Sequence, residues 1–335
     1  MDIQQIHALM DKGSLPGTDR NYEFKETHIS WLILSSDYVF KIKRPVKFSF
    51  LDFSTLEKRK FYCHQELRLN RRLAPEMYLN VLPLYSGMLQ DTTNGKKNEI
   101  IDYAVQMKRM NNEKEMDNML ESDKVTPGHI NKLAGTIASF HKQVDTIKKT
   151  FDTENLQELY ADINSVISYI TEKEGSKWAD KINDCIEKSN NFLQHNKEFL
   201  ISRNLNGYRK DCHGDLNSHN IFLYDDPVIF DCIEFNEEFR QIDILNDIAF
   251  LCVDLDFFNK KDLRKQFYQK YFRYSGIDDM PDSRRLFMYY MSYRANIRAK
   301  VTLISARKKN SSGNGTEIKD AKKYIDLMVK YSAQF

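Results

Sequence analysis

The chain has 335 residues, more than one compact core usually serves, so one large or two smaller domains are expected. Hydrophobic residues make up 41% of the sequence and charged residues 29%, which is typical of a soluble globular protein. With 50 basic and 48 acidic residues the net charge is +2, which argues against nucleic acid or a membrane surface as a general partner.

The cysteines and the N-terminus predict a cytoplasmic protein. The five cysteines include no C-x-x-C pair and no zinc-like spacing, so a reduced compartment is the simplest interpretation. The first residues, Met-Asp-Ile-Gln-Gln, are polar and lack the apolar run of a signal peptide. No stretch of about 18 consecutive apolar residues predicts a membrane span. No pattern predicts the oligomeric state.

The first third of the chain alternates as strands do. Four stretches rich in β-branched and aromatic residues predict strands, at 28–34, 38–43, 81–88 and 99–107. Ser35-Ser36-Asp37 predicts a turn between the first two, and Asn94-Gly95 a turn before the last. Ser54 with Glu57 has the pattern of a capping box that opens a helix running towards residue 73.

Helices dominate after a charged stretch at 111–123, which we expect to be a linker. Thr126 and Pro127 predict the start of a helix that runs to about residue 142. Further helices are predicted at 155–173, at 177–199 and from 243 to the end, with a break at 309–315 and a strand hairpin at 220–233. This order predicts an α+β protein of two lobes, a small antiparallel-sheet lobe over 1–108 and a larger helical lobe over 109–335.

One segment of the chain has a recognisable motif. Residues 213–220 have the H-x-D-L-x-x-x-N spacing of a kinase catalytic loop. In that pattern Asp215 is the base that receives the proton of the attacking hydroxyl, and Asn220 is a metal ligand. The structural alternative is that both are turn residues, since turns favour Asp and Asn.

The hairpin that follows predicts a magnesium site. Asp225-Asp226-Pro227 is expected to be the turn, so antiparallel pairing brings Asn220 next to Asp231. An amide oxygen and a carboxylate then converge, and Mg²⁺ takes one or two such protein ligands with phosphate oxygens and water. The structural alternative is that Asp231 merely ends a strand. However, the three apolar residues before it are expected to be buried, and a buried carboxylate requires a partner.

Two lysines and a glutamate form the complementary half in the first lobe. Lys41 and Lys43 alternate with apolar residues and project from one face of a strand. Glu66 lies on the inward face of the helix expected at 54–73, where a carboxylate needs a cation. Lys41 is the predicted partner, as in the kinase Lys–Glu pair. An ordinary salt bridge is the alternative.

These residues resemble the aminoglycoside phosphotransferase-like branch of the protein-kinase-like superfamily, and more narrowly an uncharacterised bacterial group within it. The first resemblance rests on Tyr38-Val39-Phe40-Lys41, Glu66, Cys212-His213-Gly214-Asp215-Leu216, Asn220 and Ile229-Phe230-Asp231. The second rests on Lys43-Arg44-Pro45-Val46, Phe50-Leu51-Asp52-Phe53-Ser54, Leu69-Asn70-Arg71-Arg72-Leu73-Ala74-Pro75 and Arg294-Ala295-Asn296-Ile297-Arg298-Ala299.

The resemblance implies a two-lobed kinase-like fold that binds ATP or GTP with Mg²⁺ and phosphorylates a small hydroxyl-bearing molecule. It makes Asp215 the base and gives the metal to Asn220 and Asp231. Lys41, paired with Glu66, would anchor the nucleotide phosphates, with Lys43 as the alternative anchor. Backbone near Val105 and Met107 would hold the base, and Asp247 would brace the catalytic loop.

The chain departs from the kinase pattern in three places. No G-x-G-x-x-G loop is present to cover the phosphates, and Asp231 is followed by Cys232-Ile233 instead of Phe-Gly. Glu234 and Glu237 then follow, and we expect a solvated edge there rather than a second metal contact.

The acceptor is not predicted. Arg294 and Arg298 lie one helical turn apart and would suit an anionic or sugar-like acceptor. A solvated basic face, or a contact with the acidic stretch around Asp243, is the favoured alternative.

Three other functions compete. The intact site disfavours a nucleotide-binding pseudokinase or regulatory protein. The missing glycine loop and Ala-Pro-Glu segment disfavour an enzyme that modifies proteins. A metalloprotein would use Cys212, His213, His219 and Cys232, whose spacing fits no zinc site.

Overall fold

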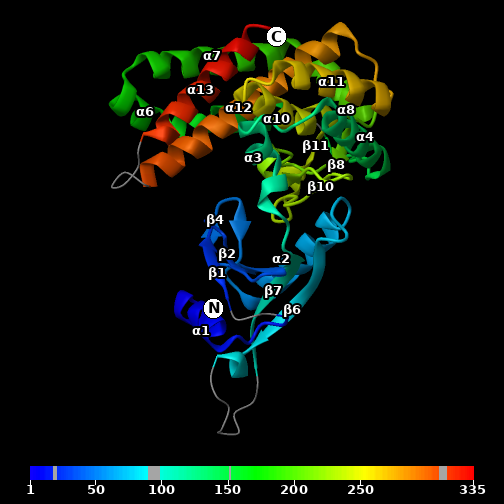
Figure 1. Ribbon diagram of the computed structural model, residues 1–335. Helices are drawn as coiled ribbons and strands as arrows, with labels where there is room; N and C mark the ends of the chain where they lie inside the picture. The colour runs from blue at the N-terminus through cyan, green and yellow to red at the C-terminus, as the bar shows by residue number, and fades with distance from the viewer. Residues whose placement is uncertain (18–20, 90–98, 151, 309–314) are drawn as a thin grey trace. The chain divides into compact units, whose positions relative to one another are not determined.

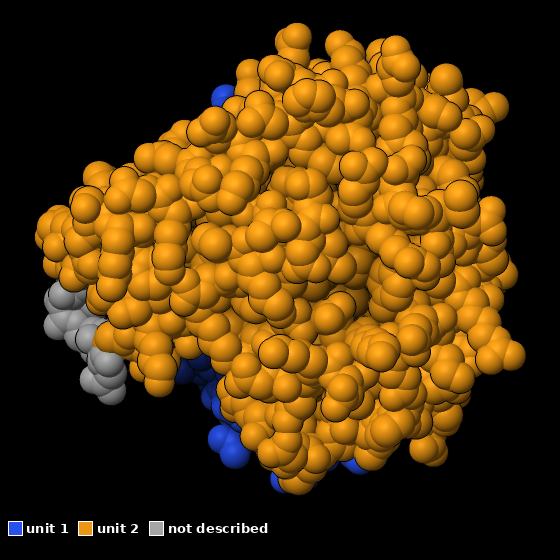
Figure 2. Space-filling view, turned by 90° about the horizontal axis from the view of Figure 1, so that it is seen from above, with its two compact units in different colours: residues 1–118, 220–224, 228–240 blue, residues 119–219, 225–227, 241–335 orange. Residues whose placement is uncertain are grey.

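The structure is a computed structural model and describes residues 1–17, 21–89, 99–150, 152–308 and 315–335. The chain divides into two compact units, coloured separately in Figure 2. Unit 1 comprises residues 1–118, 220–224 and 228–240, and unit 2 comprises residues 119–219, 225–227 and 241–335. Sheet dominates unit 1 and helices dominate unit 2, which confirms the predicted two-lobed α+β class. Unit 1 extends past residue 108 and takes up part of the later hairpin.

Unit 1 is built on an antiparallel sheet whose order, among the described residues, is β1-β2-β3-β7-β6 (Figure 1). Hydrophobic side chains alternate along the strands, so one face packs into a buried core. The β2–β3 hairpin and both later strands confirm the strand predictions. The bounds are β1 Glu23–Glu26, β2 Ser30–Leu34, β3 Tyr38–Lys43, β6 Tyr78–Tyr85 and β7 Ile100–Lys108. The predicted Asn94-Gly95 turn lies outside the described residues.

Helix α2 (Leu56–Asn70) packs against β6 and β7. Its N-cap is Thr55, whose hydroxyl accepts from the Lys58 N–H at 3.3 Å, and not the predicted Ser54. Ser54 is engaged elsewhere, because its hydroxyl donates to Asp52 at 2.6 Å. The other elements of this part are α1 Ile3–Lys12, β4 Lys47–Phe48, β5 Leu51–Asp52, η1 Ser86–Met88 and η2 Asn112–Lys114.

The stretch 111–123, predicted as a linker, does contain the division between the units, but part of it is helical. It contains η2 and the helix α3 (Met116–Glu121), and the division between the units falls within α3. Met116, Met119 and Leu120 are buried in it. Their i, i+3, i+4 spacing is that of a short amphipathic helix, which the surrounding charged residues obscured.

The predicted hairpin is present but shorter, and its register is shifted by one residue. Strands β9 (Ile221–Phe222) and β10 (Val228–Ile229) pair with Ile221 opposite Ile229. Beyond them the Phe230 N–H donates to the Asn220 carbonyl at 3.0 Å, so Asn220 lies opposite Phe230 and Asp231 is the next residue. The helix α9 (Glu237–Arg240) ends this part of unit 1.

Unit 2 is a helical body in which the long helix α12 packs against both α13 and α10 (Figure 1). The Thr126 cap and Pro127 start of α4 are confirmed. The stretch predicted as one helix at 155–173 is α5, η3 and α6, and the stretch at 177–199 is α7 and the start of α8. The bounds are α4 Pro127–Gln143, α5 Thr153–Ala161, η3 Asp162–Val166, α6 Ile167–Glu174, α7 Lys177–His195, α8 Lys197–Leu205, α10 Ile244–Phe257, α11 Lys261–Ser275, α12 Pro281–Lys308 and α13 Thr316–Ser332.

A two-stranded ribbon in unit 2 carries the predicted catalytic loop. Strand β8 (Arg209–Asp211) pairs antiparallel with β11 (Gln241–Asp243), and the loop leaves β8 directly. All five cysteines are free and buried. Residues 309–314 of the predicted break lie outside the described part of the chain. Among the described residues, no helix is both long enough and apolar enough to cross a bilayer.

Candidate functional site

Strand β3 and helix α2 bring Lys41, Lys43 and Glu66 together. The period of the strand places both lysines on one face, and Glu66 lies on the face of α2 that packs inward. Lys41 Nζ is 2.8 Å from Glu66 Oε1, and Lys43 Nζ is 2.7 Å from Glu66 Oε2. Both oxygens of a fully buried carboxylate are therefore paired, one with each lysine.

Two further carboxylates reach the same lysines from the segment after β10. Lys41 Nζ lies 2.5 Å from Asp231 Oδ1, and Lys43 donates to Glu234. The expectation of a solvated edge at Glu234 is wrong, because its side chain is only 3% exposed. The second lysine of β3 supplies the cation that a buried carboxylate requires. Lys41, Lys43, Glu66, Asp231 and Glu234 are called the charge cluster below.

The charge cluster holds two ammonium groups and three carboxylates, and burial shifts the pKa of both lysines, Glu66 and Glu234. Burial by itself lowers the pKa of Lys41, but the Asp231 and Glu66 carboxylates outweigh it and raise that pKa well above its usual value. Burial raises the pKa of Glu66, and the two lysines reverse this and lower it to about 2. Burial also raises the pKa of Glu234, which Lys43 only partly offsets. Glu66 is thus the firmly ionised centre of the cluster.

Asp231 adopts the left-handed backbone conformation, with φ of 61°. Neighbouring side chains hold this turn on both sides. The Asp231 N–H donates to Tyr78 Oη at 3.3 Å, the Cys232 N–H donates to Asn70 Oδ1 at 2.8 Å, and the Ile233 carbonyl accepts from Arg240 at 2.9 Å. The Asp231 side chain is nevertheless 42% exposed, so it is the member of the cluster most open to a ligand.

The donor set at the hairpin fits magnesium. Asp231 offers a half-exposed carboxylate, and Asn220 carries an amide oxygen at the position opposite Phe230, one residue away along the ladder. Oxygen ligands from one or two side chains are what Mg²⁺ takes from proteins when phosphates complete its shell. Asn220 itself is 8% exposed.

Val105 and Met107 lie in β7, an interior strand of the sheet. Val105 is paired with Lys41 of β3 and Val81 of β6, and Met107 with Val39 and Tyr78. Both side chains are buried in the core between the sheet and α2. Their part in holding a nucleotide base stays a prediction.

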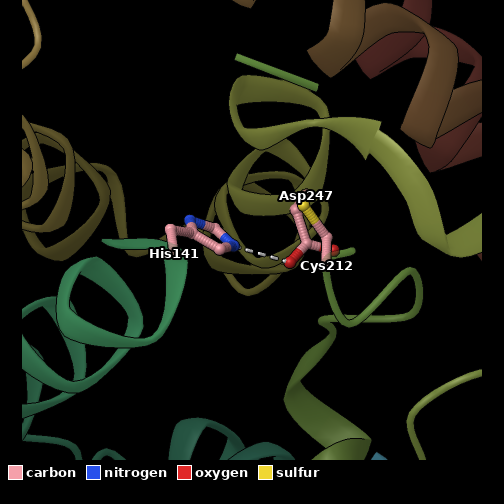
Figure 3. Close-up of side chains that lie close together, drawn as sticks. All are labelled: His141, Cys212 and Asp247. Atoms are coloured by element: carbon pink, nitrogen blue, oxygen red, sulfur yellow. Dashed lines mark hydrogen bonds and ion pairs between the residues drawn. The ribbon is translucent and has the colours of Figure 1, made fainter. Parts of the chain in front are cut away.

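In unit 2, Asp247 at the start of α10 holds the loop that contains Asp215. Its two oxygens accept the backbone N–H groups of His213 at 3.2 Å and Gly214 at 2.8 Å. The predicted bracing role of Asp247 is thereby confirmed. His141 adds a third hydrogen bond at 3.0 Å (Figure 3). Burial raises the pKa of Asp247, but the hydrogen bond and charge of His141 prevail and lower it to about 2.

His141, Cys212 and Asp247 together form the set in Figure 3, whose potential ligand atoms lie within 4.8 Å of one another. The residues differ from the predicted metalloprotein set, of which only Cys212 is included. The Asp247 carboxylate already accepts three hydrogen bonds, and His141 Nδ1 lies 2.7 Å from Tyr271 Oη. These bonds fix the loop and occupy the atoms that a metal would need.

A second carboxylate of α10 holds the far side of the loop. Asp254 Oδ2 accepts both the N–H and the hydroxyl of Ser218, each at 2.9 Å. This brace was not predicted. The signal for it is present, because Asn246, Asp247, Asp254 and Asp256 interrupt a helix that is otherwise apolar and almost wholly buried.

Arg294 completes the loop's support and does not present its charge to solvent. It is 5% exposed, and it donates to Asn246 Oδ1 at 2.7 Å and to the Gly214 carbonyl at 3.1 Å. The solvated basic face is therefore wrong for this residue, and its contact within the stretch around Asp243 is with the amide Asn246 and not with an acidic side chain. Arg298 pairs with Asp254 at 3.6 Å and donates to Tyr324 Oη at 3.0 Å.

Asp215 itself is half-buried, and its backbone is held by its neighbours. Its carbonyl accepts from the Asn217 N–H at 2.9 Å and from the Asn217 amide at 3.3 Å. Burial lowers the pKa of Arg298, but Asp254 and, more weakly, Asp215 are among the groups that raise it above its usual value. The Asp215 carboxylate thus lies in the field of a guanidinium group.

The chain matches curated proteins in sequence and solved proteins in structure. It is 31% identical over 330 residues to uncharacterized proteins of Mycobacterium tuberculosis and Mycobacterium bovis, which covers 94% of this chain and 61% of theirs. The chain thus spans about three fifths of the length of these relatives. No protein-family model matches it.

Three solved structures match it over nearly its whole length. A choline kinase from Cryptosporidium parvum has a TM-score of 0.56 and 12% identity, covering 98% of this chain and 94% of that one. A choline/ethanolamine kinase family protein from Mesorhizobium loti has 0.54 and 12%, covering 98% and 99%. The GDP complex of an aminoglycoside 2'-phosphotransferase-IIIa has 0.51 and 13%, covering 99% of each. At such identities the likeness is one of fold.

Proposed function

We propose that this chain, whose fold is that of the protein-kinase-like superfamily, is a phosphotransferase that moves the γ-phosphate of ATP or GTP to a hydroxyl group of a small molecule. The observation that carries the proposal is the Lys41–Glu66 ion pair meeting Asp231 within one unit. A lysine held by a buried glutamate and set beside a half-exposed aspartate is the arrangement that kinases use to hold phosphates and their metal ion.

We infer a role for each site residue. Lys41 anchors the nucleotide phosphates, rather than Lys43, because the Lys41 side chain is 12% exposed and that of Lys43 is 0% exposed. Glu66 orients Lys41 through its paired carboxylate. Asn220 and Asp231 hold Mg²⁺, which offsets the charge that develops on the phosphate oxygens when it is bound. Val105 and Met107 mark the strand next to the nucleotide base.

Asp215 acts as the base that orients the acceptor hydroxyl and receives its proton. Asp247 and Asp254 hold the loop backbone on either side of it, so the carboxylate is presented from a fixed frame. Preorganisation of this kind lowers the reorganisation needed when charge develops in the transition state. Arg298 adds a positive charge to the surroundings of this carboxylate.

A small-molecule acceptor is supported by the class of proteins that share the fold. The neighbours named above are a choline kinase, a choline/ethanolamine kinase family protein and an aminoglycoside phosphotransferase, all of which are named for small molecules. The chain also lacks the glycine-rich loop and Ala-Pro-Glu segment of protein kinases. We place the reaction in the cytoplasm, because the five buried cysteines form no disulfide.

The test compares Mg²⁺-dependent binding with turnover. Thermal stabilisation by ATP and slow ATP hydrolysis are measured for the natural chain, Asp231→Asn and Asp215→Asn. We expect Asp231→Asn to lose the stabilisation that Mg²⁺ adds, and Asp215→Asn to keep binding while hydrolysis falls by about a hundredfold or more.

Two outcomes would contradict the proposal in different ways. Nucleotide binding by the natural chain without turnover, also with added sugars, amino alcohols and aminoglycosides, would indicate a pseudokinase. No nucleotide binding with or without Mg²⁺ would overturn the whole assignment.

A further inference from the structure

Lys43 and Glu234 lie, with Glu66, in the buried interior of the charge cluster and have no role in the function proposed above. Their side chains are 0% and 3% exposed. Taking two charges out of water costs several kcal/mol, which their attraction offsets only when the geometry is good. A buried pair is therefore a weak source of stability, and its position in the site becomes the more informative feature.

The pair joins the same two chain segments as Lys41 and Asp231. Lys43 is two residues after Lys41 on the same face of β3, and Glu234 is three residues after Asp231. Glu66 accepts from both lysines and ties the two links together. Two ion pairs thus join strand β3 to the segment 231–234, one near the exposed end of the cluster and one in its buried interior.

Only the buried link can persist when a ligand binds. Under the proposed function Lys41 binds phosphate and Asp231 binds the metal ion, so the ion pair between them must weaken when the ligand is bound. Lys43 and Glu234 are too buried to meet a ligand and can keep their contact. In doing so they hold Glu66 and the turn at Asp231 in place.

We propose that Lys43 and Glu234 are a positioning pair, which keeps the metal-binding turn at Asp231 aligned with the phosphate-anchoring strand β3 while Lys41 and Asp231 engage Mg²⁺-nucleotide. The inference rests on the proposed function. It also accounts for the missing Phe-Gly after Asp231: Asn70, Arg240 and Lys43 hold residues 232, 233 and 234 instead.

The test uses Glu234→Gln, which nearly preserves shape, and Lys43→Met, which removes the ammonium group. Lys58→Met is the matched control, because Lys58 forms an exposed ion pair with Asp52 in the same unit. For each variant the nucleotide dissociation constant is measured with and without Mg²⁺, together with the rate of ATP hydrolysis.

We expect metal-free nucleotide affinity to change less than about threefold, since the pair does not touch the ligand. The gain in affinity that Mg²⁺ brings should fall about tenfold or more in both variants, and hydrolysis by about ten- to a hundredfold, because misplacement of about 1 Å has effects of that size. The double variant should be no worse than the worse single one, as expected for one interaction. Lys58→Met should match the natural chain.

The outcomes separate this inference from the proposed function. If Asp231→Asn abolishes the Mg²⁺ effect while Glu234→Gln and Lys43→Met retain it, the positioning role is wrong and the function stands. Lower thermal stability with an unchanged Mg²⁺ effect also contradicts it, since the pair would then be merely structural. If Lys43→Met does not fold, Glu234→Gln decides alone, because Lys43 there keeps Glu66. A natural chain that binds no Mg²⁺-nucleotide overturns both.

Discussion

The two units use their buried polar side chains in different ways. In unit 1, carboxylates meet ammonium groups, and Asp231 remains 42% exposed. In unit 2, Asp247 and Asp254 are both fully buried, and they accept backbone N–H groups of the loop. Backbone donors fix a shape, whereas ion pairs leave side chains that can exchange one charged partner for another. Unit 2 therefore fixes the loop by its backbone, whereas in unit 1 charged side chains hold one another.

The largest effect is expected from breaking the rigid side of this contrast. Asp247→Ala removes the acceptor of two loop N–H groups and of His141, leaving all three buried donors unpaired. We expect the free energy of unfolding to fall by about 3–5 kcal/mol. Urea denaturation measures this, and a loss below about 1 kcal/mol would show that the loop does not depend on the brace.

Glu66→Gln breaks the centre of the charge cluster and should cost somewhat less. Lys41 and Lys43 keep Asp231 and Glu234 as partners, but they lose the carboxylate between them. We expect a loss of about 2–4 kcal/mol in the free energy of unfolding. ATP hydrolysis should also fall by about a hundredfold, because Lys41 loses its orientation. Unchanged hydrolysis in a folded variant would contradict the role of the pair.

The pH dependence of stability distinguishes Asp247 of unit 2 from Glu234 of unit 1, because folding lowers the pKa of the first and raises the pKa of the second. The pKa of Asp247 is about 2 in the folded protein against an ordinary 3.8. Its contribution of roughly 2 kcal/mol is therefore present above pH 4 and is lost as the pH falls towards 2. The pKa of Glu234 is raised by burial, so its contribution is complete below its ordinary 4.5 and is lost as the pH rises through the folded value.

Unfolding free energies between pH 3 and 7 test these signs. Asp247→Asn should flatten the fall of stability on the acid side. Glu234→Gln should leave the acid side unchanged and remove the loss at higher pH. A natural acid slope in Asp247→Asn would place the source of acid sensitivity elsewhere.

Arg294→Lys should have a smaller effect, confined to the rigid loop. Lysine keeps the charge but cannot donate to both Asn246 and the Gly214 carbonyl with the same geometry. We expect about 1–2 kcal/mol less stability and a loss of hydrolysis with nucleotide affinity retained. Calorimetric titration alongside the hydrolysis assay separates the two readouts.

The smallest effect is expected at the surface of unit 1. Lys58→Met removes an exposed ion pair with Asp52, which solvent screens. The change in unfolding free energy should be within about 0.5 kcal/mol. A larger loss would show that charges outside the buried cluster also hold this unit together.

Residues with a periodic or motif signal were predictable from the sequence. The alternation around Lys41 gave β3, the inward face of the helix gave the burial of Glu66, and the spacing from His213 to Asn220 gave the loop. Asp247 was identified by resemblance, and its hydrogen bonds agree. The fold class followed from the order of strands and helices, which depends on composition over long stretches and tolerates errors at each boundary.

What failed depends on contacts between residues far apart in sequence. Glu234 looked like a solvated edge because two acidic residues follow closely, and only its pairing with Lys43, 191 residues away, explains its burial. The hairpin register shifted by one residue because nothing local fixes it once the strands shorten to two residues. The Thr55 cap was missed because serine and threonine are both common N-cap residues and stand next to each other here. The hydrogen bond of the Ser54 hydroxyl to Asp52 leaves Thr55 as the cap.

The left-handed backbone at Asp231 limits which residues that position can hold. Glycine, asparagine and aspartate enter this region with little strain, and only aspartate among them brings a negative charge. A single substitution to asparagine or glycine would therefore leave the backbone turn intact while removing the negative charge. If Asp231 holds Mg²⁺ as proposed, activity would be lost without a change of fold, and a descendant of this chain could keep its shape and bind nucleotide without the metal ion. The identity of residue 231 would then distinguish an active protein from an inactive one where structural similarity does not.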